Sequence, residues 1–142
     1  MARIVLTNVK VEVGAVDLSD HVASVTLSTT YDVLETTAFA GGNVPNAAKT
    51  RIAGLADNSV TLEFHQDFAA GEVEQTLYPL LGSAAAVKIK PNTSGATAAD
   101  NPEYQFDALI SEWTPLNGAV GELATASVTW PITGAITKDV TP

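Results

Sequence analysis

The chain has 142 residues, of which 46% are hydrophobic and only 6% aromatic, so it can build one hydrophobic core but not two comfortable ones. Seven Lys and Arg stand against sixteen Asp and Glu, and the net charge of −9 argues against sequence-specific binding of nucleic acid, whose phosphates an acidic surface repels. The absence of cysteine excludes disulfide bonds, thiolate metal sites and cysteine nucleophiles.

No stretch of the sequence reaches the ~18 consecutive apolar residues that a membrane-spanning helix needs. The apolar run Ile4-Val5-Leu6 near the N-terminus is also shorter than the hydrophobic region of a signal peptide. We therefore expect a soluble protein that is made in the cytoplasm and has no membrane partner.

The first 35 residues have the pattern of β-structure. Residues 4–20 are expected to form a hairpin, because valines recur at alternate positions and Gly14-Ala15 can turn the chain. Residues 21–35 are rich in alternating Val and Thr, which suit a half-buried pleated surface, and they predict one long strand or a bent pair of strands.

Residues 36–58 follow neither the helix period nor the strand period, and Gly41-Gly42 and Pro45 interrupt them. Connections longer than about 12–15 residues are uncommon in compact domains and are usually functional or disordered. Two interpretations are open, a mobile surface loop and an arm that orders against another molecule. The arm is favoured because the segment carries several large apolar residues and two of the seven cations, namely Phe39, Val44, Ile52 and Leu55 with Lys49 and Arg51.

Residues 59–68 show the most regular alternation of the sequence, with apolar side chains at even positions, except for Gln66, and polar ones at odd positions. This period of two predicts a strand with one packed face and one wet face. Between Gly71 and Gly82 the apolar residues follow helical spacing, which predicts a single short helix. The expected core residues are Val60, Leu62, Phe64, Val73 and Leu77, and the expected polar face is Glu63, His65 and Asp67.

The rest of the chain predicts three more strands, at residues 84–90, 103–113 and 126–132, with Pro131 placing the last one at an edge or marking its end. Residues 92–102 lack large apolar side chains and predict an exposed loop. About seven strands and one short helix predict a single, mainly β domain over all 142 residues. We expect two packed antiparallel sheets, arranged as a sandwich or partly closed barrel, with the helix at one side.

The sequence offers few groups for catalysis. His21 and His65 are its only histidines, which is too few for most zinc sites. His65 lies between Glu63 and Asp67 and could bind a metal weakly, but a solvated or interface face explains these residues more simply. No glycine-rich phosphate loop is present. We expect no enzymatic activity and no catalytic, cofactor-binding or metal-binding residues.

Four stretches together resemble the tail tube (major tail) proteins of long-tailed phages. They are residues 50–55 (TRIAGL), 59–64 (SVTLEF), 78–82 (YPLLG) and 127–131 (SVTWP), and the similarity runs in order from about Thr36 onward. The resemblance implies two packed β-sheets flanked by a helix, a fold shared with the tube proteins of type VI secretion systems.

The resemblance also implies a function in the tail of a virion. Such proteins form hexameric rings that stack into a tube, through which double-stranded DNA passes without specific binding during ejection. The implied partners are further copies of the chain and other tail proteins, such as tape measure, tail terminator and distal tail proteins.

The resemblance further suggests which residues take part in assembly. In these proteins a long loop between early strands contacts the neighbouring ring, and residues 36–55 occupy its place. The implied contact residues are Phe39, Val44, Lys49, Arg51, Ile52 and Leu55. Glu63, His65 and Asp67 are candidates for a lumen or subunit-boundary face, where carboxylates would repel DNA.

Two alternatives remain open. A β-sandwich binding module, such as a head decoration or adhesin-like protein, would be a defined monomer or trimer that binds capsids or glycans. A tube subunit of a type VI secretion system would have a similar fold and a different biology.

Overall fold

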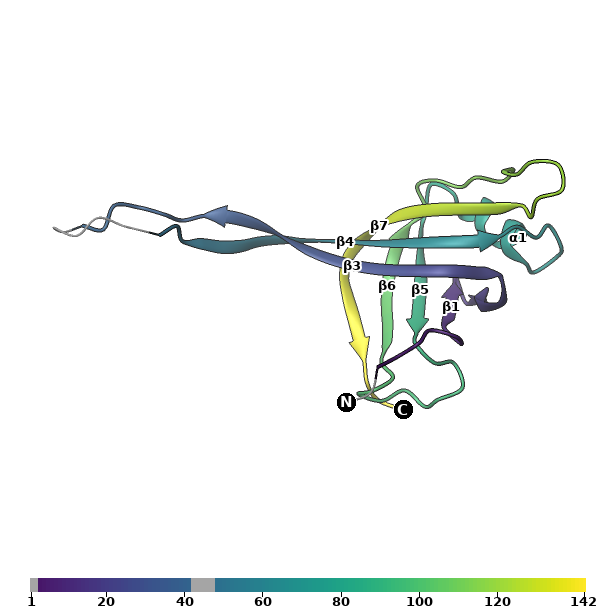
Figure 1. Ribbon diagram of the computed structural model, residues 1–142, viewed down its shortest axis with the longest axis horizontal. Coiled ribbons are helices and arrows are strands. Elements are labelled where there is room, and N and C mark those ends of the chain that lie inside the picture. The colour runs from purple at the N-terminus through teal and green to yellow at the C-terminus, as the bar shows by residue number, and fades with distance from the viewer. Residues whose placement is uncertain (1–2, 42–47) are drawn as a thin grey trace.

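The computed structural model describes residues 3–41 and 48–142, and about half of them belong to one antiparallel sheet (Figure 1). Along the sheet the strand order is β2-β1-β5-β6-β7-β4-β3, so the sheet stays open between β2 and β3 in the part of the chain that is described. The strands are β1 (Lys10–Val13), β2 (Val16–Asp17), β3 (Val22–Glu35), β4 (Arg51–His65), β5 (Ala84–Lys90), β6 (Glu103–Leu109) and β7 (Thr125–Asp139). The helical segments are η1 (Ser19–His21), α1 (Val73–Leu77) and η2 (Tyr78–Leu80).

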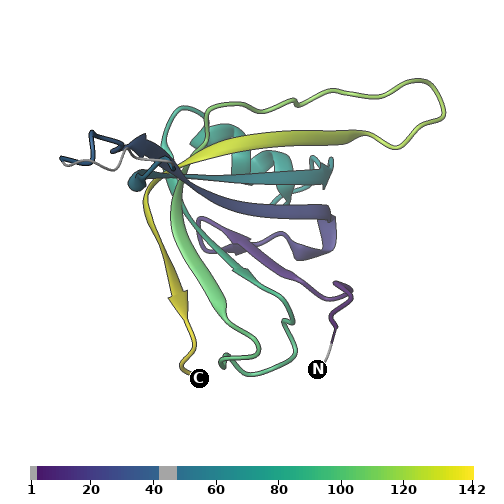
Figure 2. The same ribbon diagram turned by 60° about the vertical axis from the view of Figure 1, so that its left-hand side comes forward.

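The predicted mainly β fold with one short helix is confirmed, and strand β7 explains how its two halves are joined. The first half of β7 pairs with β4, from Thr125 opposite His65 to Pro131 opposite Ser59. The second half pairs with β6 as far as Asp139. Because β7 belongs to both halves, the two expected sheets form one continuous, bent sheet, as Figures 1 and 2 show.

The core lies on one face of this bent sheet. Alternate residues of β1, β4, β5, β6 and β7 point into it, and α1 adds Val73 and Leu77. The ring of Phe64 lies 5.7 Å from that of Trp113, edge to face, and 6.1 Å from that of Trp130. The expected core residues are all fully buried, namely Val60, Leu62, Phe64, Val73 and Leu77. Each such side chain stabilises the fold by about 1.5–3 kcal/mol through the area it removes from water.

Helix α1 is short but firmly attached to the end of β4. Trp113 donates a hydrogen bond from Nε1 to Glu74 Oε2 at 2.5 Å, and Gln66 Nε2 donates to the same oxygen at 3.1 Å. Gln66 also donates to the carbonyl of Pro115 at 2.7 Å. These bonds explain why a polar residue interrupts the apolar positions of residues 59–68. Among the described residues, no helix is long and apolar enough to cross a membrane.

The connection expected over residues 36–58 is shorter than the sequence indicated. Arg51 lies opposite Glu35 and Asn58 opposite Thr29, so residues 51–58 form the first half of β4. Residues 51–57 show no alternation of buried and exposed side chains because neither face is covered, which is why the sequence pattern missed a strand there.

The loop expected at residues 92–102 is exposed over most of its length, but Asn101 near its end is buried. The side chain of Asn101 accepts a hydrogen bond from the Asn92 backbone N–H at 3.0 Å and donates to the Asn92 and Ala96 carbonyls. The loop is therefore closed by one buried amide rather than being polar and free throughout.

Candidate functional site

The most prominent feature outside the core is a hairpin that projects far from the body of the molecule (Figure 1). It consists of residues 30–35 of β3, residues 51–57 of β4 and the described residues that connect them, and it is called the arm below. The remainder of the same two strands, residues 22–29 and 58–65, is called the base. In the base, β4 pairs with β3 and β7, whereas in the arm it pairs with β3 alone.

The arm exposes large apolar side chains on both of its faces. Leu34 and Ile52 are cross-strand partners and therefore share one face, while Val33 and Ala53 pair on the other. Leu55 is 81% exposed, and Phe39, in the connecting segment, is fully exposed. Isolated two-stranded hairpins are only marginally stable in water. The arm thus leaves large apolar side chains exposed without a core of its own to cover them.

Polar contacts hold the two sides of the arm together at its far end. The backbone N–H of Thr36 donates to the Thr50 carbonyl at 2.8 Å, and the N–H of Thr50 donates to Thr37 Oγ1 at 2.9 Å. Lys49 Nζ lies 3.6 Å from Glu35 Oε1 in an exposed ion pair. Such a pair contributes about 0–1 kcal/mol to folding, so this contact does not account for the order of the arm.

Most of the predicted contact residues lie on the arm. Ile52, Leu55 and Arg51 are on its β4 side, and Phe39 and Lys49 are in the connecting segment. Val44 lies outside the described residues. The structure thus gathers the five described residues of this set on one projecting element.

The predicted polar face is only partly assembled. Glu63 and His65 are half-exposed on the same face of β4, where Glu63 lies opposite Ser24 on β3 and Ser127 on β7. Asp67 lies beyond the end of β4 and turns toward His21 instead. The three residues therefore do not form one continuous face.

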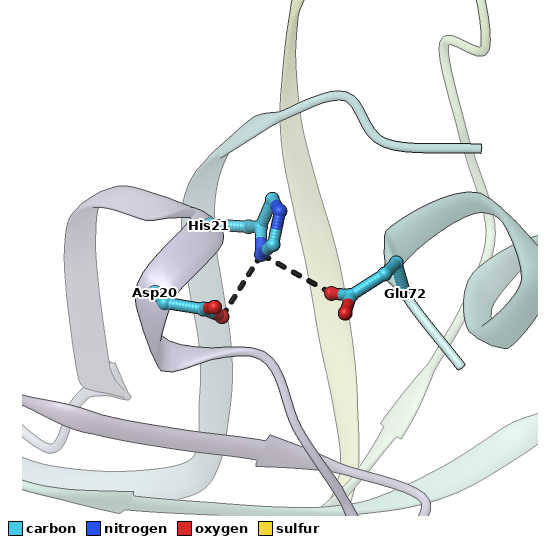
Figure 3. Close-up of side chains that lie close together, drawn as sticks. All are labelled: Asp20, His21 and Glu72. Carbon is cyan, nitrogen blue, oxygen red and sulfur yellow. Dashed lines mark hydrogen bonds and ion pairs between the residues drawn. The ribbon is translucent and has the colours of Figure 1, made fainter. Parts of the chain in front are cut away.

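His21 is the centre of a cluster with Asp20, Asp67 and Glu72 (Figure 3, which draws three of the four). Its Nδ1 lies 2.9 Å from Asp20 Oδ1 and 3.4 Å from Glu72 Oε2, and its Nε2 lies 2.9 Å from Asp67 Oδ2. Asp67 Oδ1 also accepts a hydrogen bond from the backbone N–H of Ala69 at 2.9 Å. The cluster ties η1, at the start of β3, to the segment that enters α1.

The charges in this cluster shift two pKa values. Partial burial on its own lowers the pKa of His21, but the hydrogen bonds to Asp20 and Asp67 and the charges of Asp20 and Glu72 outweigh it, so the pKa is raised. The pKa of Asp67 is lowered, first by the hydrogen bond from Ala69 and then by His21. Sequence reasoning missed the cluster because His21 and Asp67 are 46 positions apart and share no motif.

A second exposed apolar segment connects β6 to β7. Figure 2 shows this connection extending well away from the sheet. It carries Leu116, Val120 and Leu123, of which Val120 is fully exposed. In the sequence, Pro115, Gly118 and Gly121 predict only a turn region here. The signal that could have found it was the presence of three large apolar residues in a stretch with no period.

The comparisons with known proteins concern the fold. No family model matches the chain, and no curated protein matches its sequence. Solved structures that contain chains with a similar fold include the following two. One is described as "Tail of empty GTA particle computed with helical refinement, C6 symmetry", with a TM-score of 0.53 and 11% identity, over 83% of this chain and 81% of that one.

The other is described as "Cryo-EM structure of the anti-feeding prophage (AFP) baseplate, 6-fold symmetrised". Its TM-score is 0.56 and its identity 14%, over 97% of each chain. At these identities the similarity concerns the fold alone. This chain thus has a fold found in components of tail-like particles. The fold agrees with the predicted resemblance to tail proteins in general, and does not single out the tube proteins among them.

Proposed function

We propose that this protein is a structural, non-enzymatic subunit of a phage tail tube, which polymerises as stacked rings around a lumen that conducts DNA. The observation that carries the proposal is the arm, a long hairpin whose two faces are both exposed and apolar. The fold shared with a tail chain and a baseplate chain supports it.

The arm supports stacking because burying it would be strongly favourable. Tyr31, Val33, Ile52 and Leu55 are each more than half exposed in the isolated chain. Full burial of a side chain of this size is worth about 1.5–3 kcal/mol. Burial of these side chains against a second copy would offset part of the loss of freedom on association, which costs about 4–15 kcal/mol.

The edges of the sheet support association side by side. Among the described strands, β3 is the last of the sheet and pairs with β4 only, so the other edge of its 14 residues is available. Exposed edges of this length invite uncontrolled pairing unless a partner covers them. A ring of subunits in which each edge meets its neighbour would remove that hazard.

The symmetry of the similar structures favours a six-membered ring, since both were determined with six-fold symmetry. An arm that reaches a different surface of the next copy makes a heterologous contact, which repeats without limit along an axis. The net charge of −9 suits a tube for DNA, because an acidic lumen repels the passing phosphates.

Microscopy of the purified, concentrated protein tests the proposal. Negative-stain images of the wild-type protein should show single rings or tubes of stacked rings. The double variant Ile52→Asp with Leu55→Asp should stay monomeric in light scattering, with a melting temperature close to that of the wild type. The matched control is Val140→Asp, an exposed apolar residue near the C-terminus, which should assemble normally. A wild-type protein that remains monomeric at every concentration would refute the proposal.

A second candidate is a ring component of a baseplate, favoured by the similarity to the AFP baseplate chain over 97% of both chains. Such a component would close into single rings and would not grow. The length distribution in the same images distinguishes the two, because a tube subunit gives polymers whose length rises with concentration.

A further inference from the structure

The cluster around His21 has the composition and spacing of a metal site. Asp20, His21 and Glu72 each offer one ligand atom, and these atoms all lie within 4.8 Å of one another (Figure 3). Bonds of about 2.0–2.2 Å in tetrahedral geometry place zinc ligands about 3.4 Å apart. The separation of 3.4 Å between His21 Nδ1 and Glu72 Oε2 matches that value, and Asp20 is exposed enough to adjust.

Asp67 orients the imidazole of His21 as a metal site requires. A carboxylate at 2.9 Å from Nε2 accepts a hydrogen bond from the Nε2–H. With the proton held there, the lone pair of Nδ1 points between Asp20 and Glu72. Metal-binding histidines usually donate their second ring N–H to a carboxylate in this way. Asp67 is itself held by the N–H of Ala69, so its position does not depend on the metal.

The carboxylates of the cluster favour a bound dication. Among the described residues, the ion pairs formed by Asp20, Asp67 and Glu72 all involve His21 and no Lys or Arg. Three acidic side chains thus surround one imidazole without a Lys or Arg to offset their charge, and a bound divalent ion would reduce their mutual repulsion.

We propose that Asp20, His21 and Glu72 bind a divalent transition-metal ion such as Zn²⁺, with Asp67 as the outer carboxylate that orients the imidazole. One imidazole nitrogen and two carboxylates suit first-row transition metals, whereas Ca²⁺ and Mg²⁺ prefer oxygen ligands alone. The side chain of Asp20 is 76% exposed, which gives the ion a path of entry and leaves room for bound water. The ion would join η1 to the start of α1 and so fasten the base.

Zinc binding to tag-free protein tests the proposal directly. After treatment with EDTA and dialysis, calorimetry with ZnCl₂ should give one ion per chain, and the melting temperature should rise with added Zn²⁺. Addition of CoCl₂ should give visible absorption bands of protein-bound Co²⁺, whereas CaCl₂ and MgCl₂ should give neither heat nor stabilisation at the same concentrations.

Variants assign the binding to the cluster. His21→Asn and Glu72→Gln should each weaken Zn²⁺ binding at least 10-fold, and Asp67→Asn, which alters only the outer carboxylate, about 10- to 100-fold. His65→Asn is the matched control, because His65 is the only other histidine and lies outside the cluster. If His21→Asn does not fold, which circular dichroism reveals, Glu72→Gln carries the test. No binding by the wild type, equal loss in His65→Asn, or a preference for Ca²⁺ would overturn the proposal.

Discussion

The base and the arm are two parts of the same pair of strands, but they are stabilised by different contacts. In the base, β4 lies between β3 and β7, and Val60, Leu62 and Phe64 are completely buried. In the arm, β4 pairs with β3 alone, and every residue from Arg51 to Asp57 is exposed or half-exposed. Pairing of β4 with β3 thus runs through both parts, whereas pairing with β7 and packing into the core are confined to the base. The packing that stabilises the fold lies in the base, whereas the side chains of the arm stay exposed.

The largest expected effect comes from removing a core side chain of the base. Phe64→Ala should lower the free energy of unfolding by about 3–5 kcal/mol, because it leaves a cavity between Trp113 and Trp130. Phe39→Ala is the matched change in the arm and should lower the free energy of unfolding by less than about 0.5 kcal/mol. Urea denaturation of both variants measures the difference. Similar values for the two would mean that the arm packs against its own subunit.

The next effect concerns the attachment of α1 to the end of the base. Glu74→Ala removes the acceptor of the Trp113 Nε1–H and of Gln66 Nε2, and should cost about 1–3 kcal/mol, since a buried donor is left without a partner. Glu74→Gln keeps an acceptor oxygen and should cost less. Glu35→Ala, on the arm, removes only an exposed ion pair and serves as the control. Denaturation curves with equal slopes would confirm that only stability has changed.

A smaller effect is expected at the boundary between base and arm. Asn58 is buried, and its Nδ2 donates to the carbonyl of Gly134 at 3.0 Å, where β7 turns away from β4. Asn58→Ala should cost about 1 kcal/mol, because the loss of this bond is partly offset by the removal of the buried Oδ1, which has no partner. Hydrogen exchange should speed up near Asp57 and stay unchanged near Leu62. Protection that stays the same throughout would show that Asn58 does not fix the boundary.

The smallest effect on folding is expected from the cations of the arm. Lys49→Glu with Arg51→Glu should change the unfolding free energy by no more than about 1 kcal/mol, because both side chains are exposed. The same variant should weaken the stacking of rings, as sedimentation of polymers would measure, and the defect should diminish as salt is added. Normal polymerisation of the variant at moderate salt would remove the electrostatic part of the stacking contact.

The difference between the base and the arm also explains which parts of the structure could be predicted from the sequence. Burial on one face imposes a period of two, so the base strand and its core residues Val60, Leu62 and Phe64 were predicted correctly. The outer half of β4 has no buried face and therefore no period, although it pairs with β3 along its length, with one register shift between Tyr31 and Val33. Strand formation there depends on a partner strand that lies elsewhere in the sequence.

Strand β7 was predicted only in part. Pro131 was expected to end the strand or to place it at an edge, because proline cannot donate to a ladder. In the structure Pro131 lies in the last pair that β7 makes with β4, and the strand continues beside β6 to Asp139. The proline thus stands where β7 changes partner, which a local pattern cannot reveal.

Of the two candidate sites, the sequence predicts the residues of the arm but not the cluster around His21. The apolar residues and cations of the arm could be selected from the sequence, because large apolar side chains are unexpected in a long connection. Their role in assembly stays a prediction. The cluster of His21, Asp67 and Glu72 could not be found, because the residues meet only after β3, β4 and α1 are in place.

The pairing of β4 in the base also determines how the protein resists a pull along the arm. Hydrogen bonds between antiparallel strands run across the strand direction. A pull along the arm therefore shears all the bonds of residues 59–65 to β7 at the same time, instead of opening them one after another. A hairpin anchored in this way resists stretching along its length far better than it resists peeling from its side.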